Sequence, residues 1–90
     1  MITKEIEKEI AEAMNAVPRG YYIKIKSFPE YNLYIVHMRK RGWLGSNLVL
    51  SLDPCRDWGI AGDIRTATSR LKMKQEVDAI NRKSKWGKKW

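Results

Sequence analysis

The residues of this sequence that could do chemistry are cations placed beside aromatic rings. Lys24 and Lys26 follow Tyr22 in an alternating stretch, and a run of three cations comes just before Trp43. Lysine and arginine neutralise phosphates, and rings stack on unpaired bases, so this pattern is typical of nucleic-acid binding. The alternative is an ordinary solvated surface. The candidate binding residues for nucleic acid or a protein partner are Lys24, Lys26, Arg39, Lys40, Arg41, Trp43, Lys85, Trp86, Lys88 and Lys89.

The sequence offers few residues that could form a catalytic or metal-binding site. His37 is the single histidine and Cys55 the single cysteine, so a thiol nucleophile activated by histidine would require the fold to bring the two together. Asp53, Asp57 and Asp63 lack the spacing of a calcium loop, and one cysteine cannot build a zinc site. We therefore expect no enzyme, no metal, no cofactor and no small-molecule substrate, and Cys55→Ala should be silent.

Length and charge limit the remaining possibilities. Ninety residues form one domain. Residues 1–18 hold four Glu and two Lys, a net charge of −2, whereas the remaining residues hold 16 Lys and Arg against six acids, a net charge of +10. A basic body predicts an anionic partner, either nucleic acid or an acidic protein or nucleoprotein surface. The sequence has no membrane-span or signal-peptide pattern, which predicts a cytoplasmic protein.

The elements that must position these residues begin with a helix and a meander. Apolar residues recur at helical spacing over residues 3–16, with Thr3 as the cap and Pro18 after the end. Residues 21–26 alternate as a strand with one wet face. Residues 33–38 and 48–52 are predicted strands of a hairpin, and the connection between them carries the three cations.

The last third of the chain allows two interpretations. Ile64, Ala67 and Leu71 share one helical face, but the later apolar residues do not continue it. Two segments fit this pattern: a short turn from an Asp63 cap to about residue 68, then a helix over residues 73–83, with residues 69–71 extended between them. One kinked helix is the alternative. Residues 84–90 form a basic tail that is too polar to fold alone, so we expect a disordered arm that adds electrostatic affinity for nucleic acid or an anionic membrane.

The predicted fold class is α+β, a single domain over residues 1–83 with helices on one face of a three-stranded antiparallel meander. Trp58 is expected to plug one end of the sheet. The predicted core consists of Ile6, Ile10, Met14, Ile23, Ile25, Leu33, Ile35, Leu48, Leu50, Ile64, Leu71, Val77 and Ile80.

Two resemblances add to these predictions. The run from Gly62 to Ile80 contains Asp63-Ile64-Arg65-Thr66-Ala67-Thr68-Ser69-Arg70-Leu71 followed by a stretch with lysine and glutamate, and it resembles the ending of short bacteriophage and prophage proteins. That resemblance implies a host-takeover or anti-defence factor, such as an anti-CRISPR protein, acting in the host cytoplasm. The order helix, three strands, helix is similar to that of double-stranded-RNA-binding domains, although Gly62-Asp63-Ile64 stands where those domains have a basic motif.

Two functions follow as hypotheses. The first is a basic binding protein that contacts nucleic acid through one sheet face and the hairpin tip. The second is an inhibitor that occupies a host defence protein or nucleoprotein.

Overall fold

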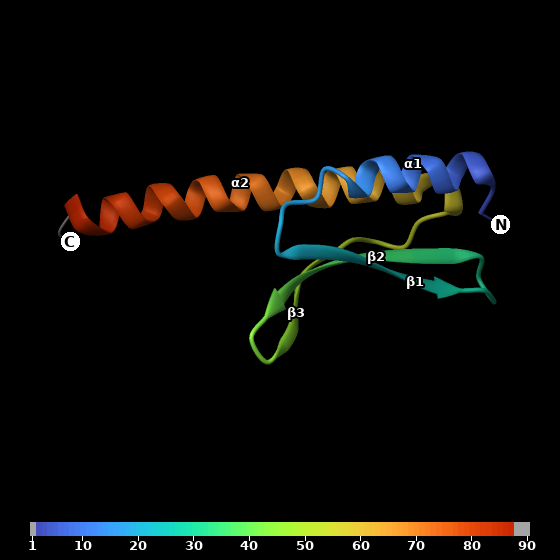
Figure 1. The fold of residues 1–90 in the computed structure, drawn as a ribbon, viewed down its shortest axis with the longest axis horizontal. Helices are drawn as coiled ribbons and strands as arrows, with labels where there is room; N and C mark the ends of the chain where they lie inside the picture. The colour runs from blue at the N-terminus through green and yellow to red at the C-terminus, as the bar shows by residue number, and fades with distance from the viewer. Residues whose placement is uncertain (1, 88–90) are drawn as a thin grey trace.

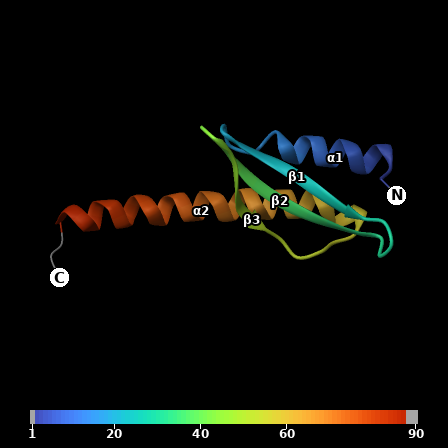
Figure 2. The ribbon, with the colours of Figure 1, turned by 90° about the horizontal axis from the view of Figure 1, so that it is seen from below.

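The computed structural model of the chain describes residues 2–87, and the side chains of residues 2–83. The elements in order are helix α1 (Lys4–Met14), strands β1 (Tyr21–Phe28), β2 (Leu33–Gly42) and β3 (Gly45–Ser51), a 3₁₀ turn (Asp57–Gly59) and helix α2 (Ile60–Gly87). Both helices lie on one side of the antiparallel sheet, and the opposite face is left uncovered (Figures 1 and 2). The predicted single α+β domain is confirmed.

Helix α1 forms where its cap and its apolar stripe coincide. The Thr3 hydroxyl accepts a hydrogen bond from the backbone N–H of Ile6 at 3.2 Å, as predicted for an N-terminal cap. Ile10 and Ala13 are buried against the rest of the core. The helix ends at Met14, two residues before the predicted end.

The sheet has the strand order β1–β2–β3, with β2 in the centre. Val36 and Met38 pair with Ile25 and Ile23 of β1, and both β2 residues are fully buried beneath the helices. The even-numbered residues of β2 therefore face the core, and the prediction that Leu33 and Ile35 lie inward is wrong. Residues 33–36, at the start of this strand, are apolar or aromatic on both faces, so they did not show which face is inward.

A β-bulge changes the register in the middle of the β2–β3 hairpin. Met38 pairs with Leu50, but Arg39, the next residue, pairs with Leu48, two positions away. One extra residue in β3 thus reverses which side chains face the core. Leu50 and Leu52 pack under the helices, whereas Leu48 is 50% exposed, so its predicted place in the core is wrong.

Helix α2 is continuous, which decides between the two interpretations of this region. Ile60, Ile64, Ala67 and Leu71 form one buried stripe against the sheet and α1. No break separates residues 63–68 from 73–83, and residues 69–71 are helical rather than extended. Asp63 lies in the first turn of the helix, not at its cap.

The C-terminal half of α2 projects beyond the sheet, which makes the molecule 54 Å long and 25 Å wide (Figure 1). The predictions that Val77 and Ile80 lie in the core are wrong, because they are 53% and 61% exposed on this projecting half. Met14 is 37% exposed, so its predicted place in the core is also wrong.

The predicted tail begins inside this helix, since residues 84–87 are helical, and residues 88–90 lie outside the described residues. Among the described residues, no helix has the length and the apolar composition needed to cross a membrane.

Candidate nucleic-acid interface

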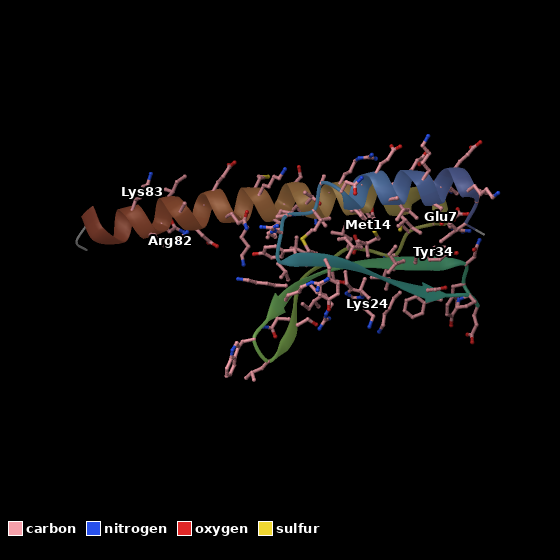
Figure 3. All side chains as sticks on the ribbon, viewed as in Figure 1. Glu7, Met14, Lys24, Tyr34, Arg82 and Lys83 are labelled. Atoms are coloured by element: carbon pink, nitrogen blue, oxygen red, sulfur yellow. The ribbon has the colours of Figure 1, made fainter. Side chains whose placement is uncertain are left out.

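The uncovered face of the sheet gathers most of the candidate cations. Outward-facing residues of β1 pair with outward-facing residues of β2, Tyr22 with Arg39 and Lys24 with His37. Figure 3 shows the Lys24 side chain directed away from the helices. We call this surface the basic sheet face; its residues are Tyr22, Lys24, Lys26, His37, Arg39 and Arg41.

The basic sheet face contains no acid to offset its charge. The three strands together carry five lysines and arginines and no aspartate or glutamate. The acids of the first 18 residues all lie on α1, on the other side of the sheet (Figure 1). The fold therefore separates the two signs of charge that the sequence places in different segments, and the uncovered face is positive.

Tyr22 lies in the middle of these cations. The Arg41 guanidinium carbon is 5.3 Å from the centroid of the Tyr22 ring, a cation–π distance. Hydrogen bonding with Ser46 lowers the pKa of the Tyr22 hydroxyl, and Arg39 and Lys24 lower it further. Arg39 is itself held in place, because its Nε donates to the Ser46 hydroxyl at 3.0 Å and its Nη2 donates to the Ser46 carbonyl at 3.2 Å. A negative charge at this place is thus stabilised by fixed donors and cations.

His37 responds to the same surroundings in the opposite direction. Burial lowers the pKa of the imidazole, and the charges of Lys26, Arg39 and Lys24 lower it further. Its Nδ1 is buried and has no hydrogen-bond partner among the described residues. The face therefore opposes a further positive charge and favours an anion.

The structure divides the run of three cations predicted to form the connecting loop. All three residues lie within β2, so their predicted placement in a loop is wrong. Arg39 and Arg41 belong to the basic sheet face, but Lys40 pairs with Tyr21 on the opposite face, where its Nζ lies 5.8 Å from the centroid of the Tyr21 ring. A strand alternates its side chains, so three successive cations cannot share one face.

The turn between β2 and β3 consists of two residues with large apolar side chains. Trp43 and Leu44 are 95% and 90% exposed. The turn is tight, since Gly45 has a φ of +137° and a Cβ on Gly42 would lie 2.9 Å from the Gly45 carbonyl oxygen. The hairpin curls away from the helices, so its tip extends beyond the basic sheet face (Figure 1).

Cys55 and His37 are not brought together. Cys55 packs with the core between the sheet and the helices, whereas His37 lies on the uncovered face. Burial raises the pKa of the Cys55 thiol to about 12, and the nearby Asp63 carboxylate adds to this shift. A thiol held protonated in this way is a poor nucleophile. No group of three or more possible metal ligands occurs in the part of the chain that the structure describes.

The remaining candidates from the end of the chain lie apart from the basic sheet face. Lys85 and Trp86 belong to the last turns of α2, at the end of the helix farthest from the sheet (Figure 1). Lys88 and Lys89 lie outside the described residues. The structure thus groups four of the ten candidates, Lys24, Lys26, Arg39 and Arg41, on one surface.

Two residues at the basic sheet face were not predicted as binding residues, and the predicted position of Trp58 was wrong. His37 and Ser46 were not candidates, although alternation along residues 37–41 places His37 with Arg39 and Arg41. Ser46 faces the same side only because of the bulge, so nothing in the sequence indicated it. Trp58 is 73% exposed in the 3₁₀ turn that precedes α2, so the prediction that it plugs the sheet is wrong.

Comparison with known proteins gives no further guide to this surface. No family model matches the chain, and neither a curated protein nor a solved structure matches it.

Proposed function

We propose that the protein binds nucleic acid through the basic sheet face and the hairpin tip. The observation that carries this proposal is an uncovered, acid-free sheet face with four cations, three of which, Lys24, Arg39 and Arg41, lie close to Tyr22. Lys24, Lys26, Arg39 and Arg41 would neutralise phosphates, and each neutralised phosphate releases counterions. Arg39 is already held in place by Ser46, so its guanidinium needs little rearrangement to bind an anion.

Single-stranded nucleic acid fits this surface better than a duplex. The protruding tip places Trp43 where an unpaired base could stack on it, and stacking of this kind contributes about 1–3 kcal/mol per base. Bases inside a duplex have no free faces for such contacts. The start of α2, which is basic in double-stranded-RNA-binding domains, instead carries Asp63 in its first turn.

Fluorescence anisotropy with labelled single-stranded and duplex oligonucleotides, across a salt series, tests the proposal. The Lys24→Gln/Lys26→Gln variant should bind more weakly, and the slope of log affinity against log salt should fall by about 1.4 for a single strand if both lysines contact phosphates. The matched control is Lys4→Gln/Lys8→Gln, which removes the same charge from exposed positions of α1. Affinity that does not respond to salt, or an equal loss in the control, would contradict the proposal.

The tip is tested separately. Trp43→Ala should weaken single-strand binding about tenfold or more and leave the salt slope unchanged, because it removes a stacking contact and no charge. Leu44→Ala, the neighbouring exposed residue, is the matched control for loss of apolar surface. If the two substitutions weaken binding equally, stacking on the indole is not the contact.

The exposed tip also favours a second function, inhibition of a host defence protein or nucleoprotein by occupancy. An exposed tryptophan beside a leucine is suited to fill a protein pocket, since tryptophan is prominent among the residues that dominate interface energetics. In this case Trp43→Ala/Leu44→Ala should abolish capture of one defined host protein from nuclease-treated lysate, while Lys24→Gln/Lys26→Gln should have less effect. Recovery of nucleic acid alone would exclude this function.

A further inference from the structure

The projecting half of α2 carries an apolar stripe that none of the described residues covers. Met73, Val77 and Ile80 are 64%, 53% and 61% exposed. We call them the distal stripe. Their spacing of four and then three residues is the heptad spacing of a helix that packs along another helix.

The distal stripe faces a different direction from the buried stripe of the same helix. At 3.6 residues per turn, Met73, Val77 and Ile80 lie about 150° around the helix from Ile64 and Leu71. The distal stripe is therefore directed away from the side of the sheet, and this domain cannot bend to bury it without breaking α2. A partner must cover it if anything does.

We propose that the distal stripe packs against the same stripe of a second copy, with the two helices antiparallel. In this arrangement Val77 of one copy lies opposite Ile80 of the other, and the reverse contact follows from the two-fold symmetry. Glu76 and Lys83 flank the same side of the stripe, at the positions that meet their own counterparts in an antiparallel pair. Glu76 then faces Lys83 of the second copy, twice in the dimer.

The parallel arrangement lacks this complementarity. Glu76 would face Asn81 of the second copy, and Arg70 would face its own counterpart across the seam. Like charges at such positions are unfavourable, and no ion pair offsets them. The charges beside the stripe thus favour the antiparallel pair.

The length of the projecting half fits the same register. Among the residues of α2 whose side chains the structure describes, up to residue 83, Leu71 is the last that is buried in the domain. When residue 77 lies opposite residue 80, residue 71 lies opposite residue 86, one residue before the end of the helix. Each projecting half would therefore be covered along its length, and the body of each copy would begin where the other helix ends. The two basic sheet faces remain uncovered in this dimer.

Sedimentation equilibrium of the full chain tests the proposal, after nuclease treatment so that bound nucleic acid cannot bridge two molecules. Three side chains per copy make a small interface, so we expect a reversible monomer–dimer equilibrium across a range from low micromolar to near-millimolar protein. Val77→Glu should leave only monomer. Because Val77 is exposed, far-UV circular dichroism of this variant should match that of the wild type.

Charge-reversal variants test whether a second copy of the chain covers the distal stripe. Glu76→Lys and Lys83→Glu should each weaken dimerisation about fivefold or more, and the double variant Glu76→Lys/Lys83→Glu should restore it. The matched control for Lys83→Glu is Arg82→Glu, which makes the same change in charge on the other side of α2 (Figure 3).

Three results would overturn the proposal. They are a monomer at every concentration, a double variant no better than the single ones, and an Arg82→Glu effect equal to that of Lys83→Glu. If the stripe instead docks on an acidic groove of another protein, the chain stays monomeric at every concentration. None of these results depends on the basic sheet face, so failure here leaves nucleic-acid binding to be decided by its own test.

Discussion

Replacing two isoleucines of α2 by alanine should separate the packed half of the helix from the projecting half. Ile64 is fully buried between the sheet and α1, whereas Ile80 is 61% exposed. Ile64→Ala removes three buried carbons, each worth about 0.8 kcal/mol, and leaves a cavity, so the free energy of unfolding should fall by about 3–4 kcal/mol. Ile80→Ala should change it by no more than about 0.5 kcal/mol.

Urea denaturation followed by far-UV circular dichroism measures both changes. For a domain of this size, with a slope of about 1.5 kcal/mol per molar urea, Ile64→Ala should lower the midpoint by about 2 M and leave the slope unchanged. The protein concentration must be low, so that pairing of the distal stripe does not contribute to stability. Equal shifts for the two variants would refute the reasoning, because they would mean that Ile80 is packed in the monomer.

Three further predictions follow from single residues. Gly45→Ala should destabilise the protein by about 1–2 kcal/mol, because φ is +137° at this position. Gly62→Ala lies in α2 with nothing within 4 Å of the added Cβ, so it should stabilise the protein by about 0.5–1 kcal/mol. Thermal denaturation of the two variants measures both changes. The folded state holds the pKa of His37 below 6.5, so the unfolded chain takes up a proton first as the pH falls. The free energy of unfolding should therefore decrease as the pH drops below about 6.5. Urea titrations of His37→Gln should show a smaller decrease over the same range. Cys55, with a pKa of about 12, should be alkylated by iodoacetamide at pH 8 far more slowly than a free thiol, and Asp63→Asn should accelerate the reaction; equal rates would argue against burial of the thiol.

The fold class was predictable because local signals agreed with the global arrangement. The cap at Thr3, the alternation in β1 and the turn residues before β2 each fix one element. The predictions that were wrong concerned how one element packs or pairs with another. The inward side of β2 could not be chosen because Leu33 and Ile35 on one face are as apolar as Tyr34 and Val36 on the other. The bulge that exposes Leu48 leaves no mark in the sequence.

The candidate site was predictable as a charge pattern but not as a surface. Lys24 and Lys26 lie where alternation predicted, since a strand with one wet face leaves little choice. Lys40 was grouped with its neighbours because the strand was predicted to end before the cations, and the longer strand moves it to the other face. The sequence left open whether α2 is continuous, because the buried stripe and the distal stripe lie on different sides of the helix. A single helix can carry both, since only the buried stripe packs against the sheet.

A sheet of three strands has two edges, and β1 is one of them. Edge strands offer unpaired backbone groups to any other strand, and lysines are a common means of preventing such pairing and the aggregation that follows. Lys24 and Lys26 occupy this edge strand, so the side chains proposed to hold phosphates also stand where lysines discourage pairing with another strand. The glutamine variants used to measure binding should therefore be checked by light scattering, and Lys24→Glu/Lys26→Glu, which keeps the edge charged, would separate lost affinity from aggregation.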